Sequence, residues 1–256
     1  NPTAVLDVLE AKIADWTAAE LKNRQMIGVG IAMQGYRTGA ADQFETPTLL
    51  ENWQNLELIP LFQDRFELPV FTENNATSSA TAEFYLGGAA EHSCFVYLSF
   101  NYGYGAGLYW QNKPVQGGHG NAGEIGSIYR PEDTIHRPAL GELLKRMQMQ
   151  GHAIAHISEL PNYFSDDLPV ISDWVQEVGP YLRQSLAALK GVMDPTAIFF
   201  GGEAPSGLRR ALINEANADD RIVHGPDPML IESRIQGDAA HVGAAFLPLH
   251  QLIFRN

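Results

Sequence analysis

The sequence predicts an α/β fold in which much of the strand pairing is parallel. Short apolar runs that suit buried strands alternate with longer segments whose apolar residues recur at helical spacing. Glycine and polar residues lie between these segments, as turns require. With 256 residues, of which 45% are hydrophobic and 18% charged, the chain can form one large domain or two lobes with a packed core.

The first half of the chain alternates helix and strand. Val5, Leu9 and Ile13 recur at helical spacing with charged residues between them, which predicts an amphipathic helix. The segment MIGVGIAM is short and apolar, as a buried strand is. In order, the expected elements are a helix over 3–22, a strand over 26–33, a helix over 58–66, a strand over 69–71, a helix over 76–87 and a strand over 95–100.

The second half begins with a glycine-rich stretch, residues 101–126, which contains eight glycines. So many glycines favour tight turns and hairpins over long regular elements. The rest returns to alternation, with helices expected over 140–149, 168–190, 208–217 and 238–251, and strands expected over 197–200 and 222–223.

Charge and cysteine content exclude several classes of protein. The 17 basic and 30 acidic residues give a formal charge of −13. Binding of DNA or RNA needs clustered Lys and Arg, so we do not expect it of this chain itself. No run of about 18 apolar residues predicts a membrane span, and no signal-peptide pattern opens the chain. A single cysteine, Cys94, excludes an internal disulfide and a cysteine-cluster zinc site. We therefore expect a cytoplasmic protein.

Glu73, Asn74 and Asn75 lie between a predicted strand and a predicted helix. Ligands of α/β sheets bind beyond the carboxyl ends of strands, where helix N-termini present free N–H groups. Adjacent carboxamides both donate and accept hydrogen bonds, which suits sugar hydroxyls. The alternative is that one asparagine only caps the helix.

Glu124 lies in a run of small residues, GGHGNAGEIG, that also contains His119. Glycines around a carboxylate allow close backbone packing beside an accessible acid, as a polar-ligand site requires. The alternative is a hairpin with a solvated glutamate.

Two further glycine motifs follow predicted strands. The run from Gly103 through Gly105 to Gly107 is compatible with a phosphate-binding turn, and Gly201-Gly202 with a nucleotide. Both motifs are weak and are equally compatible with ordinary turns. His152 and His156 have the spacing of zinc ligands on a helix but lack the accompanying glutamate, so we expect no metal site there.

Together and in order, these segments resemble the ROK family, which groups sugar-responsive repressors and sugar kinases. The resemblance implies the two-lobed, actin-like ATPase (ribonuclease H-like) fold without its first N-terminal strands. The implied lobes are residues 1–88 plus 238–256 and residues 89–237. The matching segments are 27–32, 68–76 with 82–83, 103–107, 122–126, 194–202 and 239–248.

Several departures from the family pattern affect phosphoryl transfer. Kinases of the family carry Asp at the position of Asn75, where it acts as general base, and a carboxamide is too weak a base for that role. Asn101 and Tyr102 replace a Gly and a Thr of the phosphate turn, and Ser127 replaces the family's zinc-ligating His. We therefore expect no catalytic residue, no bound ATP or magnesium and no zinc.

The sugar side of the pattern is retained. The resemblance implies sugar binding by Gly35, Asn74, Asn75, Glu124 and His119. His119 and Arg137 are also candidates to compensate for the lost zinc scaffold. Gly103, Gly105, Gly201 and Gly202 then belong to a degenerate nucleotide site.

These features predict a sugar-sensing, homodimeric or dimer-of-dimers domain of a ROK transcriptional regulator. Such regulators bind DNA through an N-terminal helix-turn-helix, which this sequence does not contain. The alternative is a divergent kinase for a hexose or N-acetylhexosamine, with Glu73 or Asp42 as base. A third possibility is a domain that only dimerises.

Overall fold

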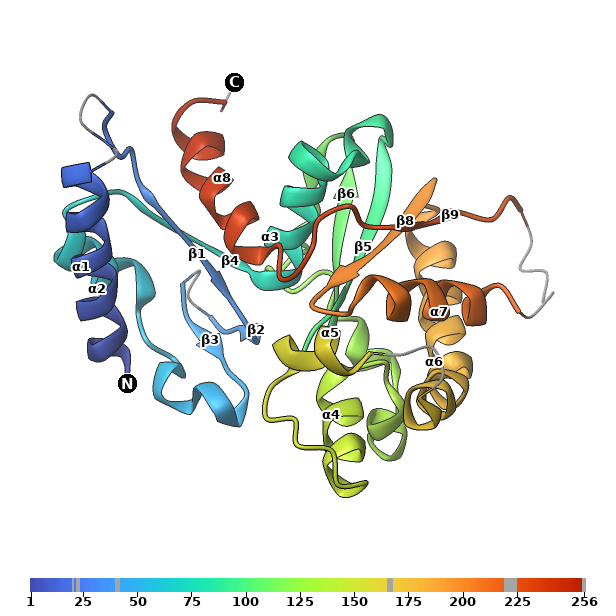
Figure 1. The fold of residues 1–256 in the computed structure, drawn as a ribbon. Coiled ribbons are helices and arrows are strands. Elements are labelled where there is room, and N and C mark those ends of the chain that lie inside the picture. Colours follow the sequence, from blue (N-terminus) through green and yellow to red (C-terminus); the bar gives the residue numbers. More distant parts are fainter. Residues whose placement is uncertain (20, 22–23, 40–41, 165–167, 219–224, 255–256) are drawn as a thin grey trace.

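The computed structural model describes residues 1–19, 21, 24–39, 42–164, 168–218 and 225–254. Its smaller sheet pairs β1 (Val29–Met33) with β4 (Val70–Asn74) in parallel. Helices α1 (Pro2–Ala19) and α2 (Leu58–Phe66) lie on one side of this sheet and α8 (Ala240–Leu252) on the other (Figure 1). A short hairpin of β2 (Tyr36–Arg37) and β3 (Phe44–Glu45) follows β1.

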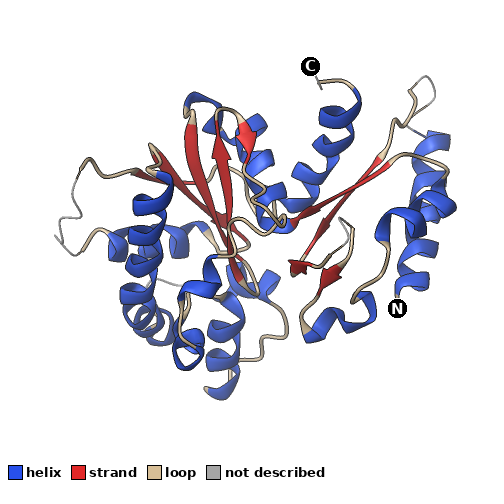
Figure 2. Cartoon of the chain, turned by 180° about the vertical axis from the view of Figure 1, so that it is seen from behind, coloured by secondary structure: helices blue, strands red, loops and turns tan. Residues whose placement is uncertain are grey.

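The larger sheet has the strand order β7-β6-β5-β8-β9. Its β5, β8 and β9 run parallel, whereas β6 and β7 pair antiparallel, so the sheet is mixed. Figure 2 shows the two sheets with two helices, α3 (Asn75–Ala82) and α8, between them and the other long helices on their outer sides. The strands are β5 (Cys94–Phe100), β6 (Tyr104–Trp110), β7 (Lys113–Pro114), β8 (Ala197–Gly202) and β9 (Met229–Glu232).

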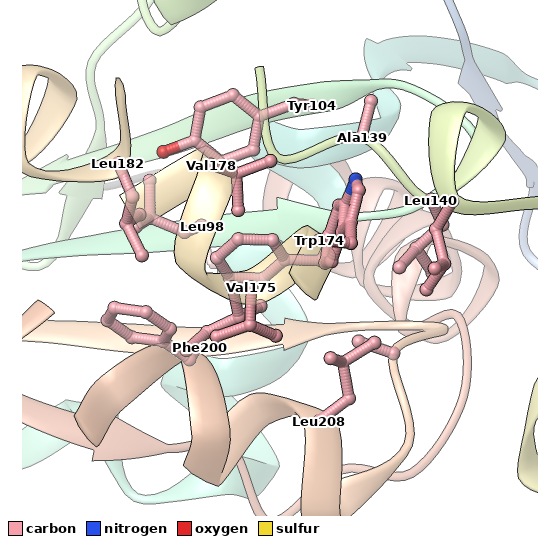
Figure 3. Close-up of a cluster of buried hydrophobic side chains, with 14 of the residues drawn as sticks. Leu98, Tyr104, Ala139, Leu140, Trp174, Val175, Val178, Leu182, Phe200 and Leu208 are labelled. Atoms are coloured by element: carbon pink, nitrogen blue, oxygen red, sulfur yellow. The ribbon is translucent and has the colours of Figure 1, made fainter. Parts of the chain in front are cut away.

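The main core lies between the larger sheet and the helices on one of its faces. Trp174, which is fully buried, packs among aliphatic side chains from the sheet and helices (Figure 3). The covering helices are α4 (Leu140–Met149), α5 (Leu160–Tyr163), α6 (Pro169–Met193) and α7 (Ser206–Ala216). A smaller aromatic cluster around Tyr97 fills the opposite face, beneath α3 (Asn75–Ala82).

Small residues let α8 contact α3 and β1 backbone to backbone. A Cβ on Gly243 would lie 1.6 Å from the carbonyl oxygen of Ser78 in α3. A Cβ on Gly30 would lie 1.8 Å from the carbonyl oxygen of Ala244. The closing GAA segment of the sequence therefore joins the helix that follows β4 to the smaller sheet.

Most predicted elements are present, with differences at their ends. The helices predicted over 58–66 and 140–149 match α2 and α4. The predicted helix 76–87 changes character at Glu83, where a π-helical turn replaces α3. The glycine-rich stretch contains the full strand β6. The strand predicted over 222–223 lies outside the described residues, and the lobe boundaries stay a prediction.

No helix in the described part of the chain is both long enough and apolar enough to cross a membrane.

Candidate functional site

An open pocket lies where the end of β4, the turn after β1 and the glycine-rich loop meet. Its empty volume, which includes space open to the solvent, is about 740 Å³. Of the residues predicted from the sequence, its lining includes Gly35, Asn74, Asn75, Glu124, Gly103 and Gly105. Residues 35 and 124 are 89 positions apart in the chain, so only the fold brings them together.

Asn74 performs both of the roles that its position allowed. Its Oδ1 accepts a hydrogen bond from the Ala76 N–H at 2.8 Å, which caps α3. Its Nδ2 donates to Glu124 Oε1 at 3.0 Å and to the Gly35 carbonyl oxygen at 3.2 Å. One side chain therefore caps the helix and joins the β1–β2 turn to the glycine-rich loop.

Glu124 is a partly buried acid whose charge depends on pH near neutrality. Burial raises its pKa from 4.5 to about 7, and the hydrogen bond from Asn74 opposes this rise only in part. The preceding Gly123 has φ +96°, and a Cβ there would lie 2.0 Å from the Ala106 carbonyl oxygen. Glycine is therefore required beside Glu124, which explains this part of the motif.

The glycine-rich loop is tied to β2 by a reciprocal pair of hydrogen bonds. Asn121 Oδ1 accepts from the Arg37 N–H at 2.7 Å, and Asn121 Nδ2 donates to the Arg37 carbonyl oxygen at 3.0 Å. The Arg37 guanidinium pairs with the buried Glu73 at 3.2 Å. These contacts fix the position of β2 relative to the glycine-rich loop and to the end of β4.

Neither alternative general base lines the pocket. Glu73 accepts hydrogen bonds from Arg37, from Gln116 at 2.5 Å and from the Asn74 N–H at 2.8 Å. Asp42 accepts from the Ile59 N–H at 3.1 Å. Both carboxylates are engaged in holding the backbone and neighbouring side chains.

The Gly201-Gly202 turn packs against side chains of this chain. A Cβ on Gly201 would lie 2.1 Å from Tyr97 Oη, which accepts a hydrogen bond from the Gly202 N–H at 2.8 Å. Asn101 Oδ1 accepts from the Glu203 N–H at 2.7 Å. These glycines do not line the pocket with Asn74. Gly103 and Gly105 do line it, as does Asn101, which contacts the Gly202 turn, and the degenerate nucleotide site stays a prediction.

Other candidate residues lie apart from the pocket. His119 is exposed on the glycine-rich loop and outside the pocket lining. His152 and His156 are not on a helix, and His156 instead accepts the Ser158 N–H at 3.2 Å as a cap. Within the described ranges, no cluster of three or more His, Cys, Asp or Glu residues could hold a metal ion. Cys94 is buried, and burial raises the pKa of its thiol.

Four lining residues carried no recognisable signal in the sequence. Their roles depend on the fold, because β2, the turn after β3, and the ends of β5 and β6 that face the pocket bring them there. They are Tyr36, Pro47, Ser99 and Tyr104.

Comparison with known proteins matches residues 2–248 to the model of the ROK family. An uncharacterized protein, y4fQ of Sinorhizobium fredii, is 24% identical over 99% of this chain and 66% of its own length. A xylose repressor of Bacillus spizizenii is 34% identical over 68% of this chain and 47% of its own length. A beta-glucoside kinase of Listeria innocua is 27% identical over 75% and 71%, respectively. The chain thus spans about half to two thirds of the first two relatives.

A solved kinase and a solved transcriptional regulator of the ROK family both share the fold of this chain. A ROK family glucokinase from Streptomyces griseus, in complex with glucose and AMPPNP, aligns with a TM-score of 0.76 and 21% identity. The alignment covers 96% of this chain and 87% of that one. A ROK family transcriptional regulator, a homolog of E. coli MLC protein, aligns with a TM-score of 0.66 and 21% identity over 96% and 67% of the two chains.

Proposed function

This chain belongs to the ROK family, and from that premise we propose that it is the sugar-sensing and dimerisation domain of a ROK transcriptional regulator. In this proposal it has no kinase activity. The observation that carries the proposal is the state of the pocket. Asn74 and Glu124 present polar groups for hydroxyls, while a carboxamide, Asn75, occupies the position of the kinases' base.

The chemistry of Asn75 supports sugar binding without phosphorylation. Its side chain donates and accepts hydrogen bonds, but its oxygen cannot take the proton of a sugar hydroxyl at neutral pH. Asn75, the first residue of α3, also accepts a hydrogen bond from the Ala76 N–H through its Oδ1, at 3.0 Å. Because Glu73 and Asp42 are engaged elsewhere, neither is placed to replace the missing base.

The residues that face Gly201-Gly202 do not fit a nucleotide site of the kinase type. Asn101 is 3% exposed and uses its Oδ1 on the Glu203 N–H, in place of a glycine whose backbone would approach a phosphate. Magnesium and phosphates would need that space for positioning. We therefore propose that ATP and magnesium have no role in this chain.

A sensing mechanism can be stated as a population shift. Gly35 and Asn74 belong to the side of the smaller sheet, and Glu124 to the loop beside the larger sheet. A sugar bonded to all three favours the arrangement in which these sides are closed. In a homodimer, the same closure changes the distance between two DNA-binding modules, which are separate basic units.

The ligand class is a small sugar. Relatives named xylose repressor and beta-glucoside kinase both support a pentose or hexose in this pocket. The kinase reading is the second candidate, because a relative of that name aligns with 75% of this chain. It requires ATP turnover that the residues described above do not favour.

A thermal-shift titration tests the proposal. The 256-residue chain is titrated with xylose, glucose, galactose and N-acetylglucosamine, each with and without MgATP. At about 100 times its dissociation constant, a ligand stabilises by roughly 2.7 kcal/mol. We expect a shift with at least one sugar that MgATP leaves unchanged.

Two substitutions of Asn74 separate the cap from the pocket. Asn74→Ala removes both functions, whereas Asn74→Asp keeps the cap oxygen and loses the amide that bonds Glu124. Both variants are expected to lose the sugar shift, and only Asn74→Ala to lose about 1 kcal/mol of stability from the cap. A shift that MgATP increases, with sugar-dependent ATP turnover, contradicts the proposal in favour of the kinase. If no sugar shifts the melting temperature, both the sensor and the kinase proposals are contradicted.

A further inference from the structure

Arg137 is a cation of the pocket lining for which the described residues provide no acidic partner. It follows the 3-10 helix Pro131–His136 and contributes to the pocket lining beside Glu124. Its Nε is buried and makes no hydrogen bond, and no acidic side chain in the described part of the chain pairs with its guanidinium. A partly buried charge without a partner is costly, so the fold retains here a group that a ligand could satisfy.

The acids in its surroundings are already engaged. Glu177, which bonds the neighbouring His136 at 2.6 Å, also pairs with Arg146 at 2.7 Å. Glu124 bonds Asn74, and at pH 7 its raised pKa leaves it with only part of a negative charge. No ion pair joins Glu124 to Arg137 among the described residues. The pocket therefore combines hydroxyl-binding groups with an uncompensated positive charge.

We propose that the pocket binds a sugar acid, whose carboxylate pairs with Arg137 while its hydroxyls bond Asn74 and Glu124. This inference rests on the proposed sugar-binding function and narrows its ligand class. The planar guanidinium matches a carboxylate with two parallel hydrogen bonds. One positive charge balances one carboxylate, whereas a phosphate ester, with about two negative charges, would leave an excess beside Glu124.

Calorimetric titration of matched sugars tests this inference. The neutral sugars glucose and galactose are compared with glucuronate and galacturonate, which carry a carboxylate at C6, and with gluconate, which carries it at C1. Glucose 6-phosphate serves as the phosphorylated probe. We expect at least one acid to bind about ten- to a hundredfold more tightly than its neutral counterpart, as a charge-assisted hydrogen bond provides.

Three variants identify the group responsible. Arg137→Gln is expected to abolish the preference for the acid while neutral sugars bind as before. Arg137→Lys keeps the charge without the fork and is expected to retain only part of the preference. Arg130→Gln, at an exposed arginine on the same segment, makes the same charge change and is expected to leave binding unaltered.

Each other outcome overturns the inference in a distinguishable way. If neutral sugars bind and acids do not bind more tightly, the sugar pocket stands and the sugar-acid assignment fails. If glucose 6-phosphate binds more tightly than every carboxylate, the ligand is a phosphosugar. If an acid binds equally well to Asn74→Ala and Arg137→Gln, it binds elsewhere. If no sugar binds, the proposed function fails too.

Discussion

Two asparagines of the pocket lining, Asn74 and Asn101, use the same side-chain chemistry at different depths. Asn74 is partly exposed and bonds Glu124, the Gly35 carbonyl oxygen and the Ala76 N–H. Asn101 is 3% exposed and bonds the Glu203 N–H and Asp238. The comparison teaches that an asparagine in a motif is accessible to a ligand only where the fold leaves its side chain partly exposed.

The largest expected effect comes from the glycine that fixes Glu124. Gly123→Ala forces a side chain into φ +96° and against the Ala106 carbonyl oxygen, so it should cost about 2–4 kcal/mol. The matched change Gly103→Ala, in the same pocket lining, meets nothing within 4 Å. Thermal unfolding should separate the two variants by roughly 4–12 °C. Equal melting temperatures would mean that the loop adapts freely and does not fix the acid.

Asn101→Ala tests the buried side of the comparison. The change removes the acceptor of the Glu203 N–H, and an unsatisfied donor should lower the free energy of unfolding by about 1–3 kcal/mol. Because Asn101 also lines the pocket, sugar affinity should fall as well, though by less than in Asn74→Ala. An unchanged affinity would show that Asn101 only supports the turn at Gly202.

The pH dependence of stability tests the environment of Glu124. Because its pKa is about 7 in the folded protein against 4.5 ordinarily, the folded form keeps a proton that the unfolded chain has released between these values. The free energy of unfolding should therefore fall as pH rises through this window and level off above it. After allowance for partial exposure, this contribution is about 1–2 kcal/mol.

Glu124→Gln removes this contribution and keeps an acceptor for Asn74. The free energies of unfolding of the variant and the wild type are measured with denaturant at pH 5 and pH 8. The variant's value relative to the wild type should be about 1–2 kcal/mol higher at pH 8 than at pH 5. A parallel pH profile for both proteins would place the carboxyl in an ordinary, well-solvated setting.

The smallest effect is expected from restoring the kinase-type acid. Asn75→Asp keeps the acceptor for the Ala76 N–H and supplies a carboxylate in the pocket lining. Asn101 still occupies the position of the family's phosphate-turn glycine, so nucleotide binding is not restored. A coupled assay of ATP turnover with glucose or xylose should show no increase over the wild type. Turnover in this single variant would show that the nucleotide side is competent and would revive the kinase reading.

Much of the fold followed from the sequence because its apolar patterns are strong. The face of α2 and the uninterrupted apolar run of β5 need only hydrophobic spacing to be found. The end of α3 did not follow: the π-helical turn begins at Glu83, a buried carboxyl that accepts a hydrogen bond from Ser233, 150 residues away. Propensity contains no information on such a contact.

The sequence by itself determined the α/β class, the family and the candidate residues Asn74, Asn75 and Glu124, because these follow from local pattern and residue type. Only the tertiary structure decided which of them share a pocket. It joined Asn74 to Glu124, left His119 on an exposed loop and brought Arg137 to the lining of the same pocket. The physical reason is that burial and hydrogen-bond partners are set by segments far apart in the chain, which spacing along the sequence does not encode.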